Sequence, residues 1–287
     1  MGRIAPAAAA VSLLLAAAAC GERSEPTGST LPLYPVTVTS AADRPLVVRR
    51  PAERIAVLTP ALLEVVGALG AGKRVVGMPV EPSGTILLRR LKKMRPDLIV
   101  ASSSADEVQL SRAATLTHAP VYLAPGDSLR GVEQAITELG LLTDQPVEAR
   151  RLVHRIEARR RLVDGRLARA KNVSVFVDTG FFTTVSDQSL VGDLIREAHG
   201  RNVAGQQEDS GPVGPRELAQ LDPRMYVATS DSGTTLRDLR RNPHTRKLRA
   251  VRTGRFAIVD AALLEPGPRV GDGLVAIARA LHPDAFR

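Results

Sequence analysis

Few residues of this chain have the spacing that a catalytic or metal site requires. The five histidines, at positions 118, 154, 199, 244 and 282, are dispersed, with no H-x-x-x-H or H-x-H pair. A zinc or manganese site built from several histidines is therefore not expected. No G-x-S-x-G motif occurs either, so a secreted hydrolase remains an alternative without an assembled site. We expect a protein that is not an enzyme and has no cofactor.

One segment has the spacing of a phosphate-binding loop. Residues 67–73, GALGAGK, fit G-x-x-x-x-G-K, but Arg74 follows where Ser or Thr must hold magnesium. The glycines also follow a predicted helix, whereas a phosphate-binding loop precedes one. We interpret them as the end of that helix.

The single cysteine, Cys20, lies where an apolar run ends. The N-terminal segment has the features of a secretory signal peptide, which we assign to residues 1–19. These features are a basic residue, Arg3, an apolar run over 4–19 and small alanines at 17–19. The run is short for a membrane span. Cys20 with Gly21 after small residues resembles a bacterial lipobox, in which the thiol receives a diacylglyceryl group and becomes the new N-terminus. Two acyl chains anchor a protein stably.

The polar residues that follow Cys20 are typical of a flexible tether, so we assign residues 20–33 to the lipidated cysteine and its linker. The chain is then exported and held at the outer face of the cell membrane, or in a periplasm. An ordinary signal peptide with an incidental Cys20 stays open as the alternative.

Composition indicates a globular protein of high positive charge. Hydrophobic residues make up 44%, charged residues 24% and aromatic residues 3%, and the net charge is +9. The basic residues are scattered among acidic ones, without the interleaved aromatic residues that single-stranded nucleic acid requires. We expect the protein to be a monomer and to have no nucleic-acid partner.

The remainder of the chain is an internal repeat of strands and helices. An opening hairpin over 34–50 precedes "RIAVLTP", a helix, "LKKMRPDLIVASSS" and "APVYLAP"; the second half repeats this order from "VSVFVDTG" to "GRFAIVD". Alternating strands and helices favour parallel sheets. We therefore predict an α/β fold of two similar lobes, residues 34–145 and 171–287.

A long amphipathic helix separates the two halves. Residues 146–170 keep apolar side chains at Leu152, Ile156, Val163 and Leu167 in a charged background. At 1.5 Å per residue this helix spans roughly 37 Å, enough to connect both lobes. A ligand cleft then lies between the lobes.

Ligands of open α/β sheets bind outside the carboxyl ends of the strands. The segments expected there are 59–62, 102–106, 179–187 and 229–234, all rich in Ser, Thr and Gly. Phe181 and Phe182 are bulky residues in such a loop. In one interpretation Phe181 forms an apolar wall for a ligand, as does Tyr122 from the other lobe; in the alternative Phe182 packs under the loop. The candidate cleft residues are Thr59, Ser103, Ser104, Tyr122, Phe181, Phe182 and Arg269.

Across nearly all of the predicted mature chain, the sequence resembles the solute-binding proteins of bacterial ABC importers for ferric siderophores, haem or cobalamin. The resemblance rests on the order and spacing of "RIAVLTPALLEVVGALGAGKRVVGM", "MRPDLIVAS", "SLVGDLIREAHGRNVAG" and "PGPRVGDGLVAIARALHP". It implies two α/β lobes joined by a rigid helix. The segment "PVEPSGTILLRR" departs from the family because it is shorter than the usual loop and lacks its aromatic and Gly-Gly elements.

The resemblance also implies partners. Family members dock on a permease through one exposed glutamate of each lobe, which correspond here to Glu64 and Glu217. The permease works with an ATPase. We expect a small-molecule metal complex as ligand, with a ferric siderophore first, because the cleft loops are hydroxyl-rich and a basic protein suits an anionic chelate. Cobalamin or haem is the alternative ligand, and a surface scaffold or sensor the alternative function.

Overall fold

The computed structural model describes residues 2, 34–41, 45–206 and 211–287. Cys20, the predicted signal peptide and the predicted tether lie outside these residues. The described residues from 34 onward belong to one compact unit, which is described by itself below. Among the described residues, no helix has the length and apolar character needed to cross a membrane.

The N-terminal lobe begins with the expected antiparallel hairpin, β1 (Val36–Thr39) and β2 (Pro45–Val48). Its four-stranded parallel sheet has the order β4-β3-β5-β6. The strands are β3 (Ile55–Val57), β4 (Val75–Gly77), β5 (Leu98–Ser102) and β6 (Val121–Ala124). The helices are α1 (Pro60–Ala68), α2 (Leu88–Met94), α3 (Glu107–Thr117) and α4 (Leu129–Leu142).

The C-terminal lobe holds the second parallel sheet, of order β12-β11-β7-β9, and a small antiparallel pair, β8 (Thr183–Thr184) with β10 (Gly211–Pro212). The four parallel strands are β7 (Val173–Asp178), β9 (Gly200–Asn202), β11 (Met225–Thr229) and β12 (Phe256–Val259). The helices are α6 (Leu190–Glu197), α7 (Pro215–Leu221), α8 (Leu236–Arg241), α9 (Arg249–Arg252) and α10 (Val270–Leu281).

The two sheets have the same topology. Numbered along the chain within each lobe, the strands lie in the order 2-1-3-4 in both. β3 and β11 are buried at every residue, as is usual for parallel strands covered by helices on both faces. The predicted fold class, two similar α/β lobes with parallel sheets, is confirmed.

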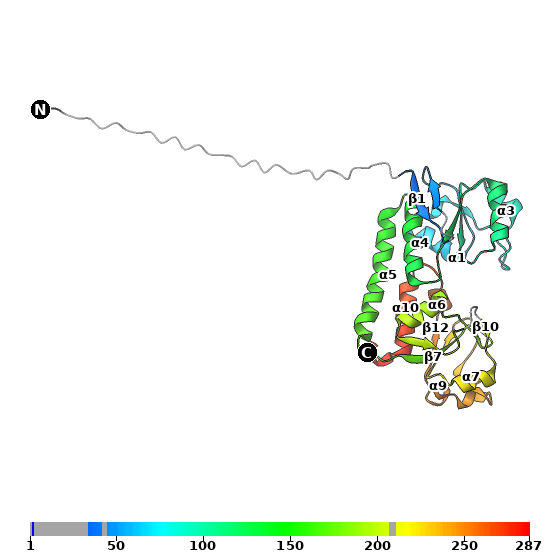
Figure 1. The fold of residues 1–287 in the computed structure, drawn as a ribbon, viewed down its shortest axis with the longest axis vertical. Coiled ribbons are helices and arrows are strands. Elements are labelled where there is room, and N and C mark those ends of the chain that lie inside the picture. The colour runs from blue at the N-terminus through cyan, green and yellow to red at the C-terminus, as the bar shows by residue number, and fades with distance from the viewer. Residues whose placement is uncertain (1, 3–33, 42–44, 207–210) are drawn as a thin grey trace. The chain divides into compact units, whose positions relative to one another are not determined.

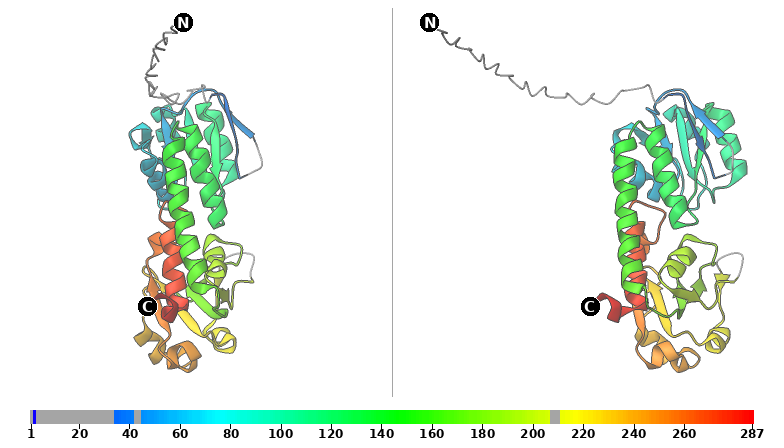
Figure 2. Two further views of the ribbon diagram at one scale, coloured as in Figure 1. Left: turned by 90° about the vertical axis from the view of Figure 1, so that its left-hand side faces the viewer. Right: turned by 60° about the vertical axis from the view of Figure 1, so that its left-hand side comes forward.

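Helix α5 (Pro146–Leu167) runs beside both lobes (Figures 1 and 2). It packs against α4 of the N-terminal lobe and α10 of the C-terminal lobe. Its 22 residues give a length of roughly 33 Å. The helix begins at the predicted Pro146 and ends at Leu167, three residues before the predicted end.

One hydrophobic core extends through both lobes. Its buried members come from the first sheet and α4 (Val57, Leu139), from α5 (Leu152, Val163) and from the second sheet and α10 (Val175, Leu274). Two smaller clusters lie on the other faces of the two sheets. The lobes therefore share buried apolar contacts through α5.

Candidate functional site

The candidate binding site is a pocket of about 680 Å³ with walls from both lobes. This volume is in the usual range for small-molecule sites. The N-terminal lobe contributes the loops after β3, β5 and β6, and the C-terminal lobe contributes the start of α6 and the loop between β12 and α10. The polar lining residues are Thr59, Glu64, Ser102, Ser103, Ser104, Asp127, Ser189, Glu265 and Arg269.

The hydroxyl wall of the pocket is held by local hydrogen bonds. Thr59 caps α1, and its Oγ1 accepts from the Leu62 N–H at 3.4 Å. The Ser102 and Ser104 hydroxyls lie 2.7 Å apart, and the Ser104 N–H donates to Ser102 Oγ at 3.1 Å. The two serine hydrogen bonds hold the loop after β5, and the Thr59 bond holds the start of α1, before any ligand arrives. This order lowers the entropy cost of binding.

Contacts between the lobes border the pocket. Arg269 Nε, at the start of α10, lies 3.8 Å from Glu64 Oε2 of α1. The Leu129 N–H of α4 donates to Asp193 Oδ2 of α6 at 2.8 Å. Arg160 of α5 lies 3.8 Å from carboxylates of both α4 and α6. Polar contacts therefore connect the two lobes both directly and through α5.

The pocket itself is acidic, although the whole protein is basic. Its lining has three carboxylates, Glu64, Asp127 and Glu265, and one cation, Arg269, which is paired with Glu64. Partial burial raises the pKa of Glu265, and the negative charges of Asp231 and Glu64 raise it further. The expectation that the net charge of +9 favours an anionic ligand at the cleft is therefore not supported by the lining.

Tyr122 is not part of the pocket, in contrast to our expectation. Its side chain is fully buried, and its hydroxyl donates to Glu138 Oε2 at 2.5 Å. Burial raises the pKa of this phenol, and the hydrogen bond to Glu138 raises it further. The strand buries alternate residues, so Tyr122 points to the core beside α4.

The two phenylalanines also lie outside the pocket lining. Phe181 is 97% exposed, while Phe182 is half-buried and packs against the core of the C-terminal lobe. Both have left-handed backbone angles, with φ of 52° and 59°, which are costly for bulky residues. The sequence-based alternative that Phe182 packs under the loop agrees with its position.

The two predicted docking glutamates lie on helices of different lobes. Glu64 is on α1, about half exposed, at the edge of the pocket. Glu217 is exposed in the first turn of α7. Their role in docking stays a prediction.

The sequence interpretation missed Asp127, Ser189 and Glu265. Asp127 follows β6 and Glu265 follows β12, which are the fourth strands of their sheets. Applying the rule of strand carboxyl ends to every strand, rather than to the first and third alone, would have found both. Among the described residues, no group of three or more His, Cys, Asp or Glu is arranged to hold a metal ion.

Comparison with known proteins gives a family match and a relative over nearly the full length of the chain. The profile of the periplasmic binding protein family matches residues 79–263. The chain is 24% identical over 309 residues to YvrC of Bacillus subtilis, an uncharacterized ABC transporter substrate-binding lipoprotein, with 96% of this chain and 97% of that protein covered.

Solved structures share the fold at low sequence identity. CeuE of Helicobacter pylori, solved as a Ni-His complex, has a TM-score of 0.77 at 16% identity, with 88% of this chain and 89% of that chain covered. The vitamin B12 binding protein BtuF of Vibrio cholerae has a TM-score of 0.71 at 17% identity, with 83% and 99% covered. These similarities establish a common fold.

Proposed function

Because this chain belongs to the periplasmic binding protein family, we propose that it is the substrate-binding protein of an ABC importer. It captures a metal complex outside the cytoplasmic membrane and delivers it to a permease that works with an ATPase. The observation that carries the proposal is the pocket of about 680 Å³ at the carboxyl ends of the strands, with walls from both lobes. The protein binds its ligand and does not transform it.

A ferric siderophore is the leading ligand. The hydroxyls of Thr59, Ser103 and Ser104 line one wall and suit an oxygen-rich chelate. The three lining carboxylates favour a complex that is neutral or positively charged, because an anionic chelate would meet like charge. Cobalamin is the alternative, as bound by the similarly folded BtuF, and haem is a further one.

Cys20 is proposed as the membrane anchor. YvrC, which matches nearly the whole chain, is described as a lipoprotein, and the residues around Cys20 resemble a lipobox. Lipidation would hold the pocket within reach of the permease, with residues 20–33 as the linker.

The test is ligand capture by the purified protein. Thermal unfolding is measured with ferric siderophores of differing charge, cobalamin and haem, and native mass spectrometry gives the stoichiometry. A ligand present at about 100 times its Kd raises the free energy of unfolding by about 2.7 kcal/mol. Ser103→Phe fills the pocket and should weaken binding at least about tenfold, since an anchoring contact is lost. The control Ser83→Phe, on an exposed loop outside the pocket, should not.

Two results would contradict the proposal. Absence of stabilisation by every complex tested would favour the surface scaffold or sensor. Equal loss of binding in the two phenylalanine variants would mean that the ligand binds elsewhere.

A further inference from the structure

The positive charge of this protein is concentrated in one segment. Residues 236–255 hold eight Arg and Lys and one Asp, a net charge of +7, while the other 267 residues together carry +2. The segment forms α8, a 3-10 turn (Thr245–Lys247) and α9, which contact one another. They lie at the end of the C-terminal lobe that faces away from the N-terminal lobe (Figures 1 and 2).

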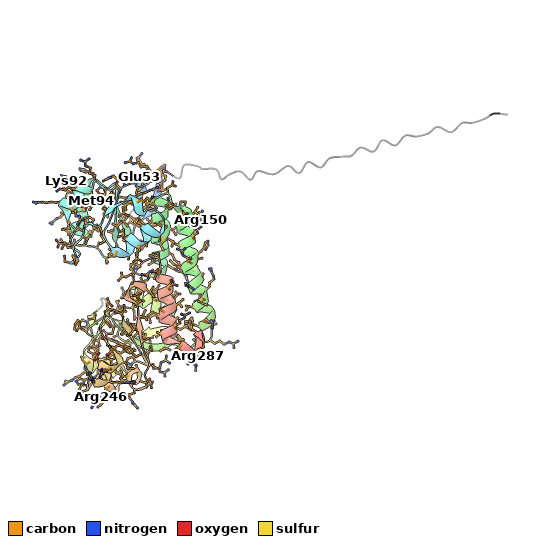
Figure 3. The ribbon with its side chains drawn as sticks, turned by 180° about the vertical axis from the view of Figure 1, so that it is seen from behind. Glu53, Lys92, Met94, Arg150, Arg246 and Arg287 are labelled. Carbon is orange, nitrogen blue, oxygen red and sulfur yellow. The ribbon has the colours of Figure 1, made fainter. Side chains whose placement is uncertain are left out.

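We call the exposed cations of this segment the distal basic surface: Arg237, Arg240, Arg241, Arg246, Lys247, Arg249 and Arg252. The apolar residues between them, Leu239, Leu248 and Val251, are buried in the core of the lobe, so the cations must face outward. Figure 3 labels Arg246 at this end of the molecule.

These charges are largely unneutralised by the protein. Within residues 34–41, 45–206 and 211–287, the ion pair formed by this surface joins Arg249 Nε to Asp222 Oδ2 at 3.6 Å, and the other six cations have none. A group of unpaired cations produces a local positive potential that attracts polyanions.

A recess of about 420 Å³ adjoins the surface at Arg249. Arg224 and Arg255 also line it, so three guanidinium groups border one cavity. Arg255 donates from Nη2 to the Leu281 carbonyl at 2.7 Å, but its buried Nε has no acceptor among the described residues. Asp284 on the rim lies 3.2 Å from Arg287. Guanidinium groups bind phosphate oxygens with two parallel hydrogen bonds, so the recess has the donors to hold one phosphate.

We propose that the distal basic surface binds the anionic headgroups of phospholipids, with one headgroup phosphate in the recess. Residues 236–255 contain no Phe, Tyr or Trp on which nucleic-acid bases stack, which favours a lipid partner over a single-stranded nucleic acid. Each Lys or Arg near an anionic bilayer strengthens binding about fivefold. This inference goes beyond ligand capture, and it takes from the proposed function only the location at a membrane.

The experiment compares the full chain on vesicles of phosphatidylcholine and of phosphatidylcholine mixed with phosphatidylglycerol. The measured quantity is the ratio of the two affinities, because an N-terminal anchor contributes to both. Arg237, Arg240, Arg241 and Arg246 are changed together to Gln. The ratio should fall at least about tenfold, since several contacts to anionic lipid are lost. It should also fall with added salt in the wild type.

The matched control changes four exposed cations of α2 in the N-terminal lobe, Arg89, Arg90, Lys92 and Lys93, to Gln. It removes the same net charge from another place; Figure 3 labels Lys92 there. The control should keep the wild-type ratio within about threefold, because those cations are distant from the bilayer. Equal falls in both variants would make the effect one of net charge and would overturn the proposal.

Two further measurements bear on the partner and the recess. Arg224→Gln should lower the ratio about fivefold, whereas Arg201→Gln, an exposed position outside the recess, should leave it unchanged. Equal effects of the two substitutions would overturn the phosphate site.

Binding to single-stranded DNA is measured at the same salt concentration as binding to vesicles. The surface would be assigned to nucleic acid instead if the protein binds the DNA more tightly than anionic vesicles and the four-residue distal variant loses this binding. Vesicle binding needs no transported ligand, so its failure would leave the proposed function intact.

Discussion

At the scale of single residues, each lobe buries a carboxylate against a tyrosine hydroxyl. In the C-terminal lobe, Asp178 is fully buried and accepts from Tyr226 and Thr234 hydroxyls at 2.6 Å and from the Gly180 N–H at 2.8 Å. In the N-terminal lobe, Glu138 accepts from Tyr122. Asp178 thereby ties the loop that carries Phe181 and the loop after β11 to the end of β7.

Removing Asp178 should destabilise the protein strongly. Asp178→Ala leaves the buried Tyr226 hydroxyl and two partly buried donors, of Thr234 and Gly180, without this acceptor. We expect the free energy of unfolding to fall by about 3 kcal/mol, since a buried unpaired group costs about 1–3 kcal/mol. Tyr226→Phe keeps the ring and removes one donor, so a loss of about 1–2 kcal/mol is expected. Urea unfolding measures both. A loss for Asp178→Ala no larger than that for Tyr226→Phe would contradict the role of Asp178 as a shared acceptor.

The sequence predicted some of the pocket residues and misplaced others for identifiable reasons. Thr59, Ser103 and Ser104 were found because the carboxyl end of a buried strand fixes where the next loop lies. Tyr122 was misplaced because the strand Val121–Ala124 is apolar throughout, so no polar alternation indicates which residues face the core. Side-chain direction in such a strand depends on the helices that cover it.

At the scale of elements, α4 and α5 approach closely at Gly140. A methyl group added there would overlap Ala149 Cβ and lie 3.1 Å from the Gln145 carbonyl oxygen. Gly165, within α5 itself, has no atom within 4 Å of the same added group. The two glycines are therefore under opposite constraints, although both are in helices.

The same substitution should have opposite effects at these two sites. Gly140→Ala gains about 1 kcal/mol of helix propensity but overpacks the helix contact, and we expect a net loss of about 1–2 kcal/mol. Gly165→Ala should stabilise by about 0.5–1 kcal/mol. Thermal and urea unfolding give both values. Stabilisation by Gly140→Ala would show that the helices separate without cost and that their contact is not tight.

The pattern of the sequence predicted which elements exist more reliably than where they end. The sequence predicts a connecting helix that reaches residue 170, but α5 ends at Leu167. The end was predicted too late because residues 168–172 contain no Gly or Pro that would mark it. The left-handed turn at Phe181 and Phe182 was also beyond prediction, since such angles are rare for these residues. Tertiary contacts decide both features.

At the scale of the whole molecule, composition gave the amount of charge but not its location. The net charge of +9 suggests a basic cleft, whereas the pocket lining has three carboxylates and one arginine. Most of the excess positive charge is in residues 236–255. The net charge of a protein bears on its solubility and long-range attraction, whereas the charge of a site follows from the residues that line it.

The proposed docking on a permease involves one glutamate from each lobe. We expect Glu217→Arg to abolish uptake in cells while the ligand affinity of the purified protein stays unchanged, because Glu217 is exposed and is not part of the pocket lining. Glu64→Arg should reduce both quantities, because Glu64 lines the pocket and pairs with Arg269. Uptake assays and calorimetry separate the two effects.

The control for docking is Asp164→Arg, an equal change of charge at an exposed position of α5. It should leave uptake at the wild-type level. If Asp164→Arg and Glu217→Arg reduce uptake equally, loss of negative charge in general, rather than a docking contact, would explain the result.

The packing of the last long helix on α5 affects how the chain acquires its structure. α10 comes near the end of the sequence, yet Gly271 lies against Ile156 in the middle of α5, and Leu274 and Ile277 belong to the core shared by both lobes. A chain that emerges from its N-terminus, from a ribosome or through a translocation channel, therefore presents one apolar side of α5 uncovered until residues 270–281 follow. During that interval the uncovered side of α5 is open to chaperones and to aggregation. A premature stop before Val270 would leave it permanently uncovered.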